Sequence, residues 1–148
     1  MKPKKVAVSA CLLGQFCRYD GTTKRVEGLQ EALQDMVVIP FCPEAPPLGT
    51  PRGRISVIRT EEGYRLWRDE DGEDVTELIE AETKKLIEEH PDLEMIILKS
   101  KSPSCGLGTT PILNEKRQLL HFGNGIATQL LRVCLPGLEM MDETRFER

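Results

Sequence analysis

Lys4-Lys-Val-Ala-Val-Ser-Ala10 predicts a short buried strand near the start of this 148-residue chain. After its two lysines the residues are small or β-branched, which is typical of a strand that is covered on both faces. Two later stretches, Met36-Val-Val-Ile-Pro40 and Leu93 to Lys99, have the same character. We therefore expect three strands, the first of them buried, and the second is expected to stop at Pro40 and Pro43 because proline cannot donate to a sheet.

The segments between these strands have helical or hairpin patterns. Helices are predicted over Val26 to Gln34, Thr76 to Glu89 and Gly123 to Leu135. Thr76 is expected to cap the second helix, with Leu78 and Ile79 on its buried face. A hairpin is predicted from Ile55 to Arg59 and Tyr64 to Arg68, and its polar joint indicates either a sheet edge or a flap. Loops are predicted over Ala45 to Arg54, which is rich in proline and glycine, and over Gly108 to Gly123, and a last strand is predicted over Gly137 to Met141. Strands that alternate with helices favour an α/β layered fold with a mainly parallel sheet.

Length and composition restrict the class of protein. Residues 1–148 are expected to form a single domain, and 39% apolar residues are enough for a hydrophobic core. A net charge of −4 argues against broad phosphate binding, so no stable nucleic-acid complex is expected. The apolar stretches are too short to span a membrane, and the basic N-terminus lacks the apolar segment of a secretory signal. We therefore expect a cytoplasmic protein with reduced thiols, which the odd number of five cysteines supports.

Three of the cysteines share a position relative to the predicted strands. Cys11 follows the first strand, Cys42 the second, and Cys105 the third after a short loop. In an open parallel sheet the loops after the carboxyl ends of the strands lie at one edge, where ligands bind. Three thiols that are far apart in the sequence are therefore predicted to meet at that edge.

Converging thiolates favour zinc, copper(I) or an iron–sulfur cluster. The chain has no Cys-x-x-Cys pair, which weakens the case for a structural zinc site. Three thiolates on a four-iron cubane would leave one iron open, as expected of a catalytic site. Glu44 places a carboxylate close to the second thiol. Cys17 is either a fourth ligand or part of a loop, and Cys134 is expected in the core.

The motifs around these cysteines resemble those of the TudS-like thiouracil desulfurases. The resemblance extends from about Val6 to Leu131 and rests on Ser9-Ala-Cys-Leu-Leu-Gly14, Cys17-Arg-Tyr-Asp-Gly21 with Lys24, Cys42-Pro-Glu44, Pro51-Arg52, Asp71-Gly72 with Asp74-Val-Thr76, and Leu98-Lys-Ser-Lys-Ser-Pro-Ser-Cys-Gly106. The chain differs from the family pattern at Ala45-Pro46-Pro47, where the family commonly has two glycines, after Arg52, and between Gly108 and Gly123.

The resemblance implies a [4Fe–4S] cluster held by Cys11, Cys42 and Cys105, with the fourth iron free for the sulfur of the substrate. The implied reaction removes sulfur from a thiolated pyrimidine, either thiouracil or a thiouridine nucleotide, and gives a carbonyl product and hydrogen sulfide. Glu44 is expected to act as general base on the attacking water, with a helix cap or a salt bridge as its alternative role. Ser102 is expected to assist catalysis by donating to the substrate or positioning it.

Five further side chains are expected to contact the substrate. They are Ser9, Asp20, Lys24, Arg52 and Ser104. A guanidinium suits a nucleotide phosphate, which would be the role of Arg52. Three of these charged side chains have an alternative role that does not involve the substrate. Asp20 and Lys24 could form a local ion pair, and Arg52 could be a solvated charge on a loop.

Two other functions are compatible with the same thiols. The first is a zinc hydrolase, although the His-x-Glu and Pro-Cys-x-x-Cys signature of the zinc deaminases is absent. The second is a cluster-binding sensor or accessory module without catalysis. Replacement of Glu44 or Ser102 separates an enzyme from a sensor, because only an enzyme would lose turnover while it keeps its cluster.

Overall fold

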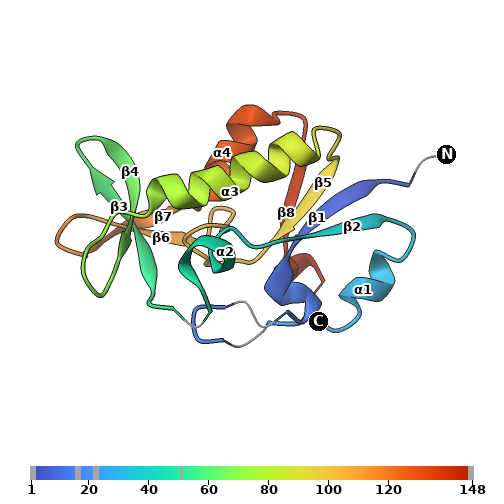
Figure 1. The fold of residues 1–148 in the computed structure, drawn as a ribbon, viewed down its shortest axis with the longest axis horizontal. Helices are drawn as coiled ribbons and strands as arrows, with labels where there is room; N and C mark the ends of the chain where they lie inside the picture. The colour runs from blue at the N-terminus through green and yellow to red at the C-terminus, as the bar shows by residue number, and fades with distance from the viewer. Residues whose placement is uncertain (1–2, 16–17, 22–23, 51, 147–148) are drawn as a thin grey trace.

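Two four-stranded sheets lie side by side in the computed structural model, which describes residues 3–15, 18–21, 24–50 and 52–146 (Figure 1). The first sheet has the strand order β2-β1-β5-β8, and the second has the order β4-β3-β6-β7. The helices α3 and α4 pack against each other and lie across both sheets. No helix within the described ranges has the length and apolarity needed to cross a lipid bilayer.

The first sheet is entirely parallel, as the sequence predicts. Its strands are β1 (Lys5–Ser9), β2 (Val37–Phe41), β5 (Met95–Leu98) and β8 (Glu139–Asp142). Pro40 does not end β2, because it lies within the strand opposite Val8. The carboxyl ends of β1, β2 and β5 therefore lie at one edge, and this is the edge from which the cysteine-bearing segments leave.

The second sheet is mixed, and the sequence predicts only two of its four strands. The predicted hairpin forms β3 (Ile55–Thr60) and β4 (Gly63–Arg68), with β4 at the edge. β6 (Thr110–Leu113) and β7 (Leu119–Gly123) occupy a segment predicted to be a loop. β6 escaped sequence analysis because it is four residues long and contains a proline, both weak signals for a strand. It pairs in parallel with β3 and so joins the hairpin to the rest of the chain.

Two of the predicted helices are present at nearly the expected bounds. They are α3 (Thr76–Glu89) and α4 (Ile126–Cys134). The first predicted helix is reduced to α1 (Leu29–Ala32), and a short helix α2 (Ala45–Leu48) begins the predicted Pro/Gly-rich loop. Two turns of 3₁₀-helix follow β1 and β8, at Ala10–Leu13 and Glu143–Arg145.

The start of α3 differs from the prediction in one detail. Thr76 is the first residue of the helix and not its cap. Its amide and hydroxyl both donate to Asp74 Oδ1, at 2.9 and 2.6 Å, and its hydroxyl oxygen accepts the amide proton of Leu66 at 2.8 Å. Thr76 thus ties the helix to strand β4. Leu78 is 45% exposed, contrary to prediction, whereas Ile79 is buried.

Apolar side chains cover both faces of the parallel sheet. Ala7 of β1 packs with residues of α3, α4 and the second sheet, whereas Val6 and Val8 pack on the opposite face with Leu12 and Leu29. This arrangement explains why β1 is a continuous apolar run, since a strand buried on both sides has no polar face. The single-domain organisation of residues 1–148 stays a prediction, which the cluster shared by both sheets supports.

Candidate active site

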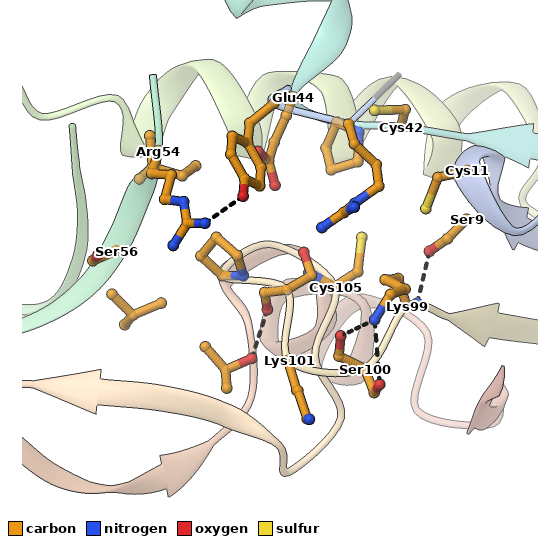
Figure 2. Close-up of a pocket in the computed structure, with 18 of the residues that line it drawn as sticks. Ser9, Cys11, Cys42, Glu44, Arg54, Ser56, Lys99, Ser100, Lys101 and Cys105 are labelled. Atoms are coloured by element: carbon orange, nitrogen blue, oxygen red, sulfur yellow. Dashed lines mark hydrogen bonds between the residues drawn. The ribbon is translucent and has the colours of Figure 1, made fainter. Parts of the chain in front are cut away.

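The three predicted thiols line one cavity of about 530 Å³ at the carboxyl edge of the parallel sheet. Cys11 lies in the 3₁₀ turn after β1, Cys42 directly after β2, and Cys105 in the loop between β5 and β6. Figure 2 shows the three cysteines around the same space, each on a different segment. Cys11 and Cys105 are buried and Cys42 is half-buried. The predicted convergence of thiols is thus present.

Glu44 lies at the wall of the cavity, two residues after Cys42, and both of its carboxylate oxygens have partners. Its Oε1 accepts from Nη2 and Nε of Arg52, at 3.2 and 3.4 Å. Its Oε2 accepts from the hydroxyl of Ser104 at 2.8 Å. The carboxylate therefore connects the Cys42 segment with the Cys105 loop.

The Cys105 loop is shaped by Ser102 and by the start of α4. Ser102 Oγ accepts the amide protons of Ser104 and Cys105, at 3.2 and 3.0 Å. The carbonyl of Ser104 accepts from the first turn of α4, and the hydroxyl of Thr128 donates to the carbonyl of Cys105 at 2.9 Å. Gly125 allows this approach, because a Cβ there would lie 2.4 Å from the carbonyl carbon of Ser104.

Burial strongly raises the pKa of the Cys105 thiol, and the negative charge of Glu44 adds to this effect. Hydrogen bonds to the hydroxyls of Ser9 and Ser102 act in the opposite direction and stabilise the thiolate. Burial and the charge of Glu44 therefore favour the protonated form of the Cys105 thiol. A thiolate ligand at this position must first lose its proton, and the two serines lower the cost of that loss.

A buried carboxylate from the C-terminal turn binds Lys99 and Ser100, which line the cavity. Ser9 Oγ accepts the amide proton of Lys99 at 2.9 Å, which joins the ends of β1 and β5. Glu143 accepts the amide proton of Ser100 at 2.7 Å and pairs with Lys99 Nζ at 3.1 Å. The Lys99 ammonium also donates to the carbonyl of Ser100 at 2.7 Å (Figure 2). Sequence analysis missed Glu143, since no motif marks it.

Basic side chains predominate around the cavity. Those that line it are Arg18, Lys24, Arg52, Arg54, Lys99 and Lys101, against the acidic residues Glu44 and Asp69. Arg54 lies 4.6 Å from the ring centroid of Tyr19 and donates to its hydroxyl. The cavity of an acidic protein is thus locally basic, which favours an anionic ligand.

Comparisons with known proteins agree with this geometry. The profile of a family described as 2-thiouracil desulfurase matches residues 6–143. The chain belongs to this family. It is 36% identical over 113 residues to the uncharacterized protein YbbK of Bacillus subtilis (strain 168), an alignment that covers 70% of this chain and 74% of YbbK. A solved structure described as the [4Fe-4S]-dependent thiouracil desulfidase TudS has a TM-score of 0.77 and 34% identity, over 96% of this chain and 92% of TudS.

The desulfurase family and the TudS fold confirm the resemblance drawn from the sequence motifs. The roles of individual residues stay predictions. Ser9, Lys24, Arg52 and Ser102 line the cavity, and Ser104 reaches it through Glu44. Asp20 is exposed, pairs with Arg18 at 3.8 Å and is not a lining residue of the described cavity. Cys17 lies outside the described residues.

One cysteine prediction is wrong. Cys134, expected in the core, is exposed at the end of α4. The apolar residues beside it suggested burial, but α4 turns Leu131 inward, and Val133 is 68% exposed. A helix presents only one side to the core, so neighbours in the sequence do not share burial.

The donor set in this desulfurase fits a cluster better than a single ion. Among the described residues, no three His, Cys, Asp or Glu side chains are close enough together to hold one metal ion. A tetrahedral zinc site requires such a group. A cluster instead takes its cysteine ligands on different irons, and soft thiols that are distributed around one cavity suit it.

Proposed function

We propose that this protein is a [4Fe–4S]-dependent desulfidase that removes sulfur from thiolated pyrimidines such as 2-thiouracil. The observation that carries the proposal is that three cysteines and the Glu44 carboxylate line one cavity, in a member of the 2-thiouracil desulfurase family. The description of TudS as [4Fe-4S]-dependent supports the same cofactor here.

Cys11, Cys42 and Cys105 would hold the cluster as thiolates. When bound, it supplies an open iron that acts as a Lewis acid for the soft sulfur of a thiocarbonyl. The chain provides a confined site in which Cys11 and Cys105 are buried. Ser9 and Ser102 stabilise the thiolate of Cys105 through the hydrogen bonds described above.

Glu44 is the proposed general base. A carboxylate at the wall of the cavity takes a proton from a water molecule, whose oxygen then attacks the thiocarbonyl carbon. The C=S bond is replaced by C=O, and the sulfur leaves as hydrogen sulfide with the two protons of the water. No net oxidation or reduction occurs. Ser102 assists by holding the amides of Ser104 and Cys105 in place.

The basic surroundings of the cavity support a substrate with a phosphate, such as a thiouridine nucleotide, in addition to the free base. Six basic side chains against two acidic ones favour an anion within a protein whose net charge is −4. We propose a small-molecule substrate and no stable nucleic-acid complex. The cytoplasmic location expected from the sequence stays part of this proposal.

Anaerobic reconstitution tests the proposal. We expect a brown protein with about four irons and four sulfides per chain, which converts 2-thiouracil to uracil and hydrogen sulfide. Cys11→Ala, Cys42→Ala and Cys105→Ala should each lose the cluster and turnover. Cys134→Ala, at an exposed position, is the matched control and should retain both.

The other outcomes identify the alternatives. A protein that keeps its cluster but turns over neither thiouracil nor thiouridine nucleotides would be a sensor or accessory module. A colourless protein that takes up stoichiometric zinc would contradict the desulfidase and favour a hydrolase. Glu44→Gln distinguishes catalysis from cluster binding, because it should lower kcat to a small residual rate while iron and sulfide content stay at the wild-type level.

A further inference from the structure

Both oxygens of the Glu44 carboxylate accept hydrogen bonds from side chains that the sequence predicts to bind substrate. Arg52 directs two of its nitrogens at Oε1, and the hydroxyl of Ser104 donates to Oε2. The ion pair is well shielded, with 7% exposure of the Arg52 side chain and 13% of the Glu44 side chain. Ser104 is fully buried. Such shielding favours a fixed geometry over a flexible surface contact.

Arg52 is itself anchored from several directions. Its Nη1 donates to the carbonyl of Gly49 at 3.0 Å and to Thr50 Oγ1 at 3.3 Å. Its amide donates to the carbonyl of Tyr19 at 2.6 Å. The guanidinium thus uses one nitrogen to hold its own loop and the other two to hold Glu44. This arrangement depends on the planar, forked shape of the group, which a lysine cannot reproduce.

Ser104 is also anchored by hydrogen bonds, through its backbone amide and carbonyl. Its amide donates to Ser102 Oγ at 3.2 Å, and its carbonyl accepts from Ala127 and Thr128 in the first turn of α4. Ser104 also precedes the predicted ligand Cys105. Its bond to Glu44 therefore fixes the distance between the proposed base and the loop that carries the third thiol.

We propose that Arg52 and Ser104 are positioning residues that hold the Glu44 carboxylate for attack by water, and that their main role is not to bind substrate. The inference rests on the proposed desulfidase function and assigns two roles within that site. Fixed orientation matters because a displacement of about 1 Å in a catalytic group can reduce the rate of reaction by about 100-fold. Arg52 and Ser104 fix both oxygens of the carboxylate and so restrict such displacement.

The two possible roles of Arg52 predict different kinetics. A phosphate-binding arginine acts on the nucleotide alone, so its loss would raise KM for 2-thiouridine 5′-monophosphate and leave 2-thiouracil unaffected. A positioning arginine acts through Glu44, so its loss lowers kcat for both substrates. The reconstituted variants Arg52→Gln, Arg52→Lys and Ser104→Ala should be assayed with both substrates, with iron and sulfide content measured on each sample.

We expect kcat to fall by about 10- to 100-fold in Arg52→Gln and by about 5- to 20-fold in Ser104→Ala, with KM within about twofold for both substrates. Arg52→Lys should recover little of the loss, because lysine has the charge without the fork. Arg65→Gln is the matched control. Arg65 also pairs with two carboxylates, but it lies on β4 outside the cavity, and we expect its variant to retain wild-type turnover.

A second set of variants asks whether both residues act through Glu44. In a Glu44→Gln background, Arg52→Gln and Ser104→Ala should each change residual kcat by less than about twofold, since the group they position is already lost. The melting temperature of the same holoproteins provides a readout that needs no turnover. Arg52→Gln should lower it in both backgrounds, because the bonds to Gly49 and Thr50 are lost in each, and by more in the wild type, where the bond to Glu44 is lost as well.

Several results would overturn the inference. The first two are a rise in KM that is confined to the nucleotide and full activity of Arg52→Lys. The other two are a loss of kcat in Arg52→Gln or Ser104→Ala that is just as large in the Glu44→Gln background, and a loss of cluster in proportion to the loss of activity. Failure of the proposed function is seen separately, as a wild-type protein that holds its cluster and does not turn over. In that case the melting-temperature cycle decides, and additive shifts contradict the contact between Arg52 and Glu44.

Discussion

Glu143 accepts the amide proton of Ser100 at 2.7 Å, and so the C-terminal turn holds the end of strand β5. The second oxygen of this carboxylate accepts from the hydroxyl of Ser100 at 3.0 Å and pairs with Lys99. Glu143 is only 3% exposed. A residue at the far end of the sequence thereby supports the segment that leads to Cys105.

Glu143→Ala should destabilise the protein by about 3 kcal/mol, because the buried amide and hydroxyl of Ser100 lose their acceptor and the ammonium of Lys99 loses its negatively charged partner. We also expect poorer cluster retention, since the loop after β5 loses its support. Urea unfolding measures the first effect, and iron content after gel filtration the second. Glu139→Ala on β8 removes an exposed carboxylate, and its effect should stay within about 0.5 kcal/mol. Equal effects of the two variants would contradict the argument.

Gly125 offers a second test of how the Cys105 loop is held. A Cβ at this position would lie 2.4 Å from the carbonyl carbon of Ser104 and 2.7 Å from the amide nitrogen of Cys105. Its φ of −65° is open to any residue, so the constraint is space and not backbone conformation. Gly125→Ala should cost about 1 to 3 kcal/mol of stability through overpacking, and it should reduce cluster content by displacing Cys105.

Gly137 provides the matched control for this substitution. An alanine Cβ there would meet no atom within 4 Å, and its φ is not positive. We expect Gly137→Ala to leave the unfolding midpoint and the iron content at wild-type levels. If Gly125→Ala also leaves both unchanged, the loop has room to move, and the close packing against α4 does not restrain Cys105.

The convergence of the thiols could be predicted from the sequence because it depends on topology. Once β1, β2 and β5 are identified as parallel strands, the residues that follow them must meet at one edge of the sheet. Cys11 and Cys42 follow directly and required no knowledge of side-chain packing. Cys105 follows after a loop, and its position depends on the start of α4.

The second sheet and the contacts of Glu44 could not be predicted in the same way. β6 is short, contains a proline and is defined by pairing with a distant hairpin, so its local sequence carries a weak signal. The bonds from Arg52 and Ser104 to Glu44 connect residues 8 and 60 positions apart. Motif membership identified all three residues but assigned Arg52 and Ser104 to the substrate. Only the folded arrangement directs them at Glu44.

Asp74 gives rise to a prediction about acid stability. Burial tends to raise its pKa, but hydrogen bonds from Arg65 and Thr76 outweigh burial and hold the pKa below its usual value of 3.8. A depressed pKa stabilises the folded protein above the unfolded pKa, and this contribution is lost as pH falls through the folded pKa. Asp74→Asn should therefore cost about 1 kcal/mol or less at pH 7, given the partial exposure of the pair, and progressively less as pH falls below 3.8.

Urea unfolding between pH 2.5 and 7 measures this difference. Asparagine keeps an oxygen that accepts the Thr76 amide proton, so the substitution removes the charge and the oxygen that accepts from Arg65 and leaves the bond to Thr76. Glu62→Gln, in the exposed turn of the β3–β4 hairpin, should differ from the wild type by a small amount that does not vary with pH. A difference between Asp74→Asn and wild type that stays constant down to pH 2.5 would contradict the assignment to the carboxylate.

Cluster loading should depend on pH through Cys105. Burial and the charge of Glu44 raise the pKa of this thiol, so at neutral pH the proton competes with iron for the sulfur. Binding releases that proton, and the equilibrium therefore moves toward the loaded protein as pH rises. Anaerobic reconstitution under limiting iron should be less complete at pH 6.5 than at pH 8.5. Ser9→Ala removes a hydrogen bond that stabilises the thiolate and should shift the loading curve to higher pH, whereas Ser56→Ala, which lines the same cavity on β3, should leave it in place. A loading curve that is flat from pH 6.5 to 8.5, or the same shift in both serine variants, would show that deprotonation of Cys105 does not limit assembly.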